Sequence, residues 1–475
     1  SDQTQIYSNV TAVNGVITFN NLNLVAIPRN DYLLRFTRTD GSTAVGATVD
    51  SQSIEIKHAP AHHLVFETQP SGSVSGVALT QQPVLRVVDQ YGNTVYGDDT
   101  VRVKAELVNP SNTDVFSATS VTVDRDTGLA TFTNVTLAAK KGNYKIRFTA
   151  VSTGSSSVAI DTKTIDSDSF ALTHGAAAAL KVATAAAEAR AGQVFVTQPI
   201  VHILDSQGNL VDTGSEADDT INVSVSGGGA AGLYLSRNSV TASGGVTRFH
   251  LDNTKALGLT GTAGTYTLTY TLNSGSITDT QTIALTAGAA YQLGESVAPA
   301  TSIATGAIFT TNPAVTVRDQ WNNIISTEND ATAKVSLVLP AATGSTVRAA
   351  SAAVKAVNGV ITFTGLNYVE LPATGYSLKY ELVGGVNDDR YLTSSQFEII
   401  PGAPTKLAWV TEPAGARSGI NFTTQPVIEV QDFYGNAVRD GNTQIRASVV
   451  SAPNGMTVSA SDVNSTCLLY TSDAA

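Results

Sequence analysis

Aspartate is the residue type whose repetition in this sequence could support chemistry. Two sets of three aspartates each begin after an apolar run and continue with an adjacent pair further along the chain. Carboxylates that meet at one end of a domain can bind Ca²⁺, which takes about six to eight oxygen ligands. The sets are Asp89, Asp98 and Asp99, and Asp205, Asp218 and Asp219. Because the spacing to the pair differs between the sets, Ca²⁺ is the second hypothesis here, and the absence of any cofactor is the first.

The first aspartate of each set belongs to a motif, Asp-x-x-Gly-Asn, that occurs four times. In a type I turn, an aspartate at the first position accepts a backbone hydrogen bond, and a glycine at the fourth adopts a left-handed or extended conformation. Asn322 replaces the glycine in one copy, and Asn tolerates positive φ well. The motif therefore predicts structural turns rather than metal ligands. The predicted turn residues are Asp89, Gly92, Asn93, Asp205, Gly208, Asn209, Asp319, Asn323, Asp432, Gly435 and Asn436.

The other reactive residue types form no recognisable catalytic set. Cys467 is the single cysteine and has no histidine in a partner motif, which argues against a thiol nucleophile. Three histidines near one linker could bind a transition metal, but the other repeats lack them. They are His58, His62 and His63. Gly227-x-Gly229-x-x-Gly232 matches a dinucleotide fingerprint in its letters only, because a short strand rather than a helix is expected to follow it. We expect no catalysis.

The elements that position these residues repeat along the chain. The four motif aspartates are 116, 114 and 113 residues apart, which is the length of a domain. Each copy also holds a Gly-x-x-x-Phe segment followed by an alternating triplet that begins with a tyrosine. Residues two apart share one face of a strand, so the triplet is predicted to be a core strand. The four tyrosines, Tyr32, Tyr144, Tyr266 and Tyr376, are predicted to form stabilising tyrosine corners.

The strand before each motif indicates the type of sheet. After the prolines at 83, 199, 313 and 426, the second and fourth residues are always apolar, whereas the third is Arg86, His202, Thr316 or Glu429. A strand with one buried face and one solvent-exposed face is typical of an antiparallel sandwich layer. We therefore predict an all-β chain of tandem immunoglobulin-like antiparallel β-sandwiches, arranged as an extended rod.

Composition excludes several functional classes. The net charge is −11, from 28 basic and 39 acidic residues, so no basic surface for nucleic acid is expected. No apolar run approaches the roughly 18 residues of a membrane span, so no membrane insertion is expected within this chain. With one cysteine, the sandwiches cannot contain the inter-sheet disulfide of antibody domains. Each domain must be stabilised by its apolar core.

Short Gly, Ala and Pro linkers predict the domain boundaries. Whole repeats are expected at 58–174, 175–287 and 288–401, a C-terminal half repeat at 1–57 and an N-terminal half repeat at 402–466. Residues 467–475 resemble the translation of a sequencing adapter and are left out of the fold prediction. Residues 176–191 favour helix by propensity, but their equal spacing with the other copies predicts strand and loop.

The segments Leu407–Asn436 and Ala356–Leu378 carry a specific resemblance. Their Leu-x-x, Ser-Gly, Thr-Thr-Gln-Pro-Val, Asp-x-Tyr-Gly-Asn, Asn-Gly-Val-x-Thr-Phe and Gly-Tyr-x-Leu patterns resemble bacterial immunoglobulin-like repeats of large surface proteins, such as the invasin and intimin type. This resemblance implies a non-catalytic stalk or adhesive segment outside the cell. Its partners would be neighbouring repeats and a host-cell, matrix or glycan ligand.

An alternative is that the repeats are ligand-binding accessory modules of a secreted polysaccharide-active enzyme. Exposed aromatic residues near the turns would support carbohydrate binding. The candidates are Tyr91, Tyr96, Trp321 and Tyr434.

Overall fold

The structure is a computed structural model that describes most of the chain. It covers residues 10–448 except 42, 98–99, 153–159, 161, 228–237, 250–255, 274, 341–350, 384–390, 440–442, together with 450 and 463–464. Several predicted residues therefore lie outside the described part: Asp98, Asp99, Gly229, Gly232 and Cys467.

The described residues form almost only strands. Their buried apolar side chains make three clusters, which lie within the predicted repeats 58–174, 175–287 and 288–401, named units 1, 2 and 3 below. The strands of unit 1 are β5 (His63–Thr68), β6 (Ser73–Val74), β7 (Val84–Val88), β8 (Val101–Leu107), β9 (Val115–Ser117), β10 (Val121–Thr122), β11 (Leu129–Thr131), β12 (Thr136–Ala138), β13 (Gly142–Tyr144), β14 (Ile146–Ser152), β15 (Thr164–Asp166) and β16 (Phe170–Thr173). Those of unit 2 are β17 (Ala179–Thr184), β18 (Ala189–Arg190), β19 (Gln193–Val194), β20 (Ile200–Leu204), β21 (Thr220–Gly227), β22 (Ser239–Thr241), β23 (Val246–Arg248), β24 (Gly258–Leu259), β25 (Gly264–Leu272) and β26 (Thr278–Thr286). Those of unit 3 are β27 (Gln292–Val297), β28 (Ser302–Ala304), β29 (Ala314–Arg318), β30 (Thr332–Val338), β31 (Val354–Lys355), β32 (Val360–Thr362), β33 (Ala373–Val383), β34 (Tyr391–Thr393) and β35 (Phe397–Ile400).

Units 2 and 3 are each a sandwich of a larger sheet against a three-stranded sheet, whereas the strands of unit 1 pair as β10-β8-β14-β15, β11-β7-β5, β12-β9 and β13-β16-β6. In unit 2, a five-stranded sheet in the order β18-β26-β25-β21-β22 lies against a three-stranded sheet, β17-β20-β23. Unit 3 repeats this order as β28-β35-β33-β30-β31 against β27-β29-β32, with β34 added beside β33. All pairs in these two units are antiparallel except β18 with β26 and β28 with β35, which run parallel. The predicted all-β class and sandwich repeats are confirmed.

The alternation of the strand before each motif accounts for the inner faces. Leu85 and Val87 on β7 are at most 1% exposed, because both side chains point between the sheets. The prediction of a wet outer face is wrong at Thr316, which is buried. Its hydroxyl donates to the Gly294 carbonyl and accepts from Arg318 Nε, so the arginine side chain covers it.

The predicted strand and loop at 176–191 are confirmed, since β17 and β18 lie there. The helix propensity of this segment is overridden because β17 pairs in register with β20 and thereby places its apolar side chains in the core. In the described part of the chain, the one helical element is the short 3₁₀ turn η1 (Ser215–Asp218). No helix among these residues is long and apolar enough to cross a membrane.

The predicted tyrosine corners are present in all four copies. Each tyrosine hydroxyl donates to a backbone carbonyl four or five residues upstream, in the loop that enters its strand. The pairs are Tyr32 with Ile27, Tyr144 with Lys140, Tyr266 with Thr262 and Tyr376 with Leu371, at 2.7 to 2.9 Å. The corner fixes the shape of that loop, which lies at the C-terminal end of the unit.

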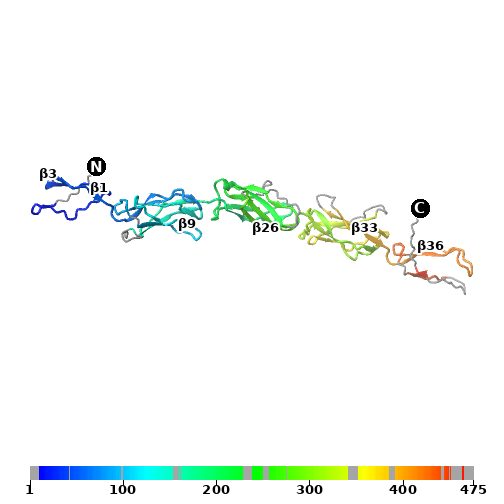
Figure 1. Cartoon of the computed structure of the whole chain (residues 1–475). Coiled ribbons are helices and arrows are strands. Elements are labelled where there is room, and N and C mark those ends of the chain that lie inside the picture. The colour runs from blue at the N-terminus through cyan, green and yellow to red at the C-terminus, as the bar shows by residue number, and fades with distance from the viewer. Residues whose placement is uncertain are drawn as a thin grey trace.

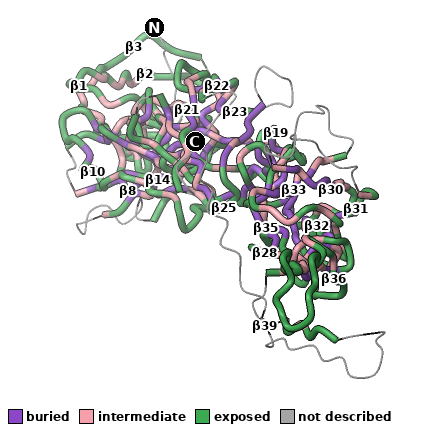
Figure 2. The backbone as a smooth tube through the Cα atoms, turned by 90° about the vertical axis from the view of Figure 1, so that its right-hand side faces the viewer, coloured by how far each residue is buried: buried purple, intermediate pink, exposed green. Residues whose placement is uncertain are grey.

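The units lie end to end, so the chain is an extended rod (Figure 1). Separate two-stranded pairs lie at its two ends. They are β1 (Arg29–Tyr32) with β4 (Ile54–Ile56), β2 (Arg35–Asp40) with β3 (Thr43–Asp50), β36 (Lys406–Thr411) with β37 (Val427–Gln431), and β38 (Gln444–Ile445) with β39 (Val463–Asn464). Leu407 on β36 is 57% exposed, whereas Leu180 and Leu293 at the same position are 6% and 9% exposed. In Figure 2 the chain around β36 is mostly green, whereas the strands inside the units include purple, buried segments.

The tyrosine corner of unit 3 gives the first prediction. Tyr376→Phe removes a 2.7 Å hydrogen bond from a side chain that is fully buried, so it is expected to destabilise unit 3 by about 1 kcal/mol. Tyr391→Phe, on an exposed side chain of the same unit, is the matched control. Scanning calorimetry of the whole chain should show one unfolding transition lowered by the first change only. Equal effects of the two variants would contradict a structural role for the corner.

Candidate functional site

A buried aspartate carboxylate lies at the start of each unit, where it meets the linker. Asp205 is 2% exposed and accepts four hydrogen bonds. Its Oδ1 accepts from the backbone N–H groups of Gln207 and Asn209, and its Oδ2 accepts from the Gly175 N–H and from Asn209 Nδ2. Four donors match the roughly four lone-pair sites of an ionised carboxylate. The carboxylate thereby connects the linker, the turn and the asparagine side chain.

The same arrangement occurs at the other three motifs. Asp89, Asp319 and Asp432 are all fully buried. Their Oδ2 atoms accept from the linker N–H of Ala59, Gly288 and Gly402, at 2.8 to 2.9 Å, and from the side-chain amides of Asn93, Asn323 and Asn436, at 2.8 to 3.0 Å. The motif therefore closes a turn and also anchors the linker that joins the unit to its predecessor.

Hydrogen bonding sets the protonation state of these carboxylates. Burial alone raises the pKa of a carboxyl, but the donated hydrogen bonds outweigh burial and hold the pKa of Asp89 and Asp205 below the ordinary value. The same balance lowers the pKa of Asp432 to about 2. Asp89, Asp205 and Asp432 are thus ionised at neutral pH. The contact region between two neighbouring units, which contains this aspartate, is called a joint below.

The asparagine of three motifs also reaches the preceding repeat, and Asn93 Nδ2 does so by donating to the Ala26 carbonyl at 3.4 Å. Asn209 Nδ2 donates to the Ala139 carbonyl at 3.0 Å, and Asn209 Oδ1 accepts from the Lys141 N–H at 2.8 Å. Both partners lie in the tyrosine-corner loop of unit 1. At the next joint, Asn323 makes the same two contacts, with the Gly261 carbonyl at 2.9 Å and the Ala263 N–H at 2.6 Å. The side-chain amide of the asparagine therefore both donates a hydrogen bond to, and accepts one from, the main chain of the neighbouring unit.

The joints differ in the residue two positions after the aspartate. Trp321 packs against the core cluster of unit 2, although it belongs to unit 3. A Cβ on Gly192 would lie 2.1 Å from Trp321 Cη2, so only glycine fits beneath the ring. Tyr434 lies in the same way over Gly306 of unit 3. The corresponding residue at the joint between units 1 and 2 is Gln207.

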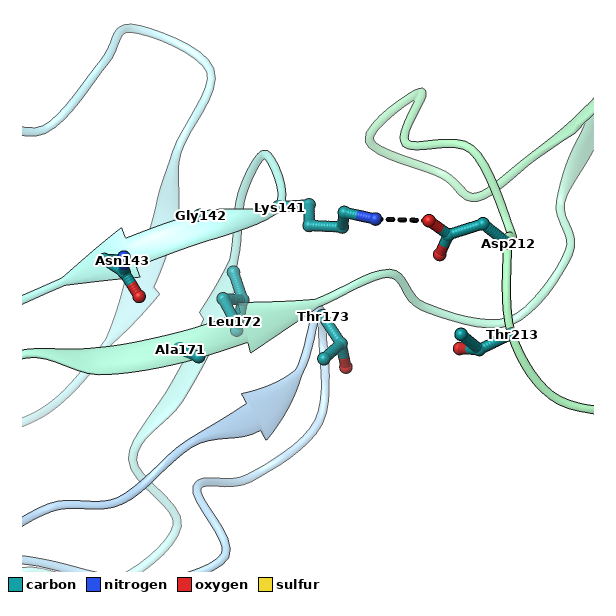
Figure 3. A pocket seen from close by; sticks show the side chains of 8 residues that line it. All are labelled: Lys141, Gly142, Asn143, Ala171, Leu172, Thr173, Asp212 and Thr213. Atoms are coloured by element: carbon teal, nitrogen blue, oxygen red, sulfur yellow. Dashed lines mark hydrogen bonds and ion pairs between the residues drawn. The ribbon is translucent and has the colours of Figure 1, made fainter. Parts of the chain in front are cut away.

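That joint carries an ion pair instead of an aromatic ring. Lys141 Nζ of unit 1 contacts the Asp212 carboxylate of unit 2, as Figure 3 shows. The Lys140 ammonium donates to the Gln207 carbonyl, and His174 Nε2 lies 2.8 Å from Thr213 Oγ1. A cavity of about 320 Å³ lies between the two units, lined by Lys141, Gly142, Asn143, Ala171, Leu172, Thr173, Asp212 and Thr213.

The structure separates the residues of the second calcium set. Asp218 Oδ1 accepts from the Gly244 N–H and Asp219 Oδ1 from the Thr220 N–H, while Asp205 has its four donors at the joint. Among the described residues, no group of three His, Cys, Asp or Glu side chains could hold a metal ion. Calcium binding stays a prediction, since Asp98 and Asp99 of the first set lie outside these residues.

The histidines and aromatics of the sequence prediction have separate surroundings. His58 Nδ1 and Nε2 lie 2.9 and 2.8 Å from the carbonyls of Ala59 and Tyr96. His62 and His63 contact each other, Nδ1 to Nδ1, at 3.2 Å. Of the four aromatic candidates for carbohydrate binding, Trp321 packs at a joint. Tyr434 lies over Gly306 but is 47% exposed, and Tyr91 and Tyr96 are 53% and 49% exposed.

Sequence reasoning missed two parts of the joint. One is the contact of the asparagine with the preceding unit, although a turn alone does not require Asn93, Asn209, Asn323 and Asn436 in all four copies. The other is the glycine seven residues before the strand proline. It occurs in every copy with positive φ, as Gly76, Gly192, Gly306 and Gly419. This spacing was the available signal.

No protein-family model matches this sequence, and no curated protein matches it. Among solved structures, the chain is similar to invasin, a bacterial integrin-binding protein, with 14% identity over 78% of this chain and 68% of that chain and a TM-score of 0.29. It is also similar to extracellular cadherin domains 1–4 of protocadherin gamma B7, with 11% identity, coverage of 74% and 79%, and a TM-score of 0.31. A three-domain immunoglobulin fragment of titin is similar with 12% identity over 73% of this chain and 100% of that chain, and with a TM-score of 0.24. These likenesses concern the fold alone.

The lowered carboxyl pKa values give the second prediction. An unfolded aspartate has a pKa of about 3.9. Because the folded pKa is lower at Asp89, Asp205 and Asp432, these carboxylates stabilise their joints fully above about pH 4, and this contribution is lost as the pH falls toward the folded value. For Asp432 that value is about 2. NMR of aspartate labelled at the carboxyl carbon should show one resonance titrating near pH 2 that is absent from Asp432→Asn. A titration of Asp432 near pH 4 would contradict the role of its donors.

Proposed function

We propose that this chain is a non-catalytic stalk segment of an extracellular or cell-surface protein. The observation that carries the proposal is the asparagine amide that binds main-chain atoms of the preceding unit at successive joints. A stalk holds its two ends at a fixed separation, and it can do so only if the joints between its units resist bending. The neighbouring repeats are therefore the first partners of each unit.

The physical case for stiffness is the density of contacts at a short linker. The linker N–H of Gly175 is bound by Asp205, and the linker N–H of Gly288 is bound by Asp319. A net hydrogen bond contributes about 1 kcal/mol, and bonds to a charged group contribute more, so each joint is held by several such contributions. A sandwich of ordinary strand length adds about 35–40 Å, so the three whole units would span about 110 Å.

The adhesive part of the proposal concerns the outer surface and the ends of the rod. Tyr91 and Tyr96 are exposed aromatic side chains at the start of unit 1, beside the Asp89 motif. They are the residues from which contact with a host-cell, matrix or glycan ligand would be tested first. A stalk that carries such a ligand site works outside the cell, where it can reach across the gap to another surface.

The third prediction tests the asparagine contacts. The double variant Asn209→Ala and Asn323→Ala removes the four cross-joint hydrogen bonds, so the rod is expected to bend. Small-angle scattering should report a clearly shorter maximum dimension than for the unchanged chain, with unchanged circular dichroism. Asn222→Ala, an exposed residue of β21, is the matched control.

A compact unchanged chain would remove the stalk proposal. Addition of EDTA to the unchanged chain gives a further arm of the same experiment. An unaffected dimension supports joints closed by the protein alone, whereas collapse on chelation would instead assign the stiffness to calcium.

A further inference from the structure

The two complete joints are built on one plan but differ in what surrounds the asparagine contacts. Both have the bound aspartate, the linker N–H and the two amide contacts to the preceding loop. They differ at the residue two positions after the aspartate, Gln207 in one and Trp321 in the other. This difference allows a direct comparison within one chain.

The joint between units 2 and 3 is filled by an apolar ring. Trp321 lies in a socket formed by Gly192 and Gly288, and a Cβ on Gly288 would lie 3.4 Å from Trp321 Cζ3. The ring packs against the core cluster of unit 2. A tryptophan side chain buries about 150–250 Å² when covered, and salt does not weaken this burial. A cavity of about 170 Å³ lies beside the ring, between Gly192 and Tyr291.

The joint between units 1 and 2 has the socket but no ring. Gly76 takes the same left-handed conformation as Gly192, with φ of 83° against 77°. Nothing lies within 4 Å of a Cβ built on Gly76. The Gln207 side chain turns away and accepts from the Ser206 hydroxyl of its own turn. A cavity of about 320 Å³ lies elsewhere at this joint, between Lys141 and Asp212.

An exposed ion pair spans that space. The Lys141 and Asp212 side chains are 49% and 34% exposed. Exposed pairs of this kind contribute little and are screened by salt, because the Debye length falls from about 30 Å at 0.01 M to about 3 Å at 1 M. The Lys140 ammonium on the Gln207 carbonyl and His174 Nε2 beside Thr213 Oγ1 and Asp212 are further polar contacts here. The side-chain contacts that this joint has beyond the shared plan are therefore polar, and the ion pair among them depends on ionic strength.

We propose that the joint between units 1 and 2 is a salt-responsive hinge, and that the aromatic ring in a glycine socket is what makes the next joint rigid. This extends the proposed stalk: the rod bends at one defined place rather than evenly. The residue two positions after each joint aspartate selects between the two kinds of joint.

The test measures the distribution of distances across each joint by electron spin resonance. The whole chain with Cys467→Ser carries spin labels at Arg102 and Ser224 for the first joint, or at Ser224 and Thr393 for the second. All three positions are exposed. Between 0.02 M and 1 M salt, the distribution across the first joint is expected to widen about twofold, whereas that across the second stays narrow.

Two substitutions exchange the behaviour of the joints. Gln207→Trp places a ring over Gly76 and should make the first joint narrow at both salt concentrations. Trp321→Gln should widen the second joint. Lys141→Met should widen the first joint at low salt, and Lys145→Met, on an exposed lysine of the same unit, is its control.

The outcomes separate this proposal from the stalk itself. If the distance distributions across both joints are narrow at both salt concentrations, the hinge proposal is overturned and the stalk proposal stands. If both distributions are equally wide at low salt, the hinge proposal and the stalk proposal are both overturned. If Trp321→Gln lowers the stability of unit 3, Gln207→Trp still decides the question, because it is expected to add order rather than remove it.

Discussion

The architecture of this chain depends on one buried charge per joint. A carboxylate in a nearly dry site is stable only if its lone pairs are filled, and here the four donors come from the linker, the turn and an asparagine side chain. Because the Gly175 N–H belongs to the linker, the path of the chain into unit 2 is fixed by the same atom pair that satisfies the charge. The sandwich cores stabilise each unit, but the carboxylate fixes the direction in which the linker runs from one unit to the next.

The tyrosine corner connects the core to the joint. Tyr144 packs against the core of unit 1, and its hydroxyl holds the carbonyl of Lys140. The residues on either side of Lys140 supply the carbonyl and the N–H that the next unit binds. The surface that receives the following unit is therefore prepared by a side chain anchored in the preceding core. Stability inside a unit and stiffness between units share this residue.

The sequence was sufficient for the parts of the fold that depend on local periodicity. Alternation along β7 and β20, the recurring tyrosines and the Asp-x-x-Gly turns are patterns that each unit satisfies alone. The exceptions involve contacts between segments far apart. Thr316 is buried because Arg318 covers it, and Asn209 binds Ala139, 70 residues away. Trp321 looked like a surface aromatic because nothing in its own unit reveals Gly192. Such contacts depend on how two units meet; the recurring asparagine and glycine mark the positions involved but do not identify their partners in the neighbouring unit.

The asparagine contacts at the two joints between whole units are made with main-chain atoms of the preceding unit, and this has an evolutionary consequence. Asn209 binds backbone groups of Ala139 and Lys141, whereas Asn323 binds those of Gly261 and Ala263, so the side chains at these positions are free to diverge. A unit inserted, duplicated or deleted by recombination would still meet a neighbour that accepts it. Copy number can then change within a lineage without redesign of any interface. The length of such a protein becomes a trait on which selection can act directly.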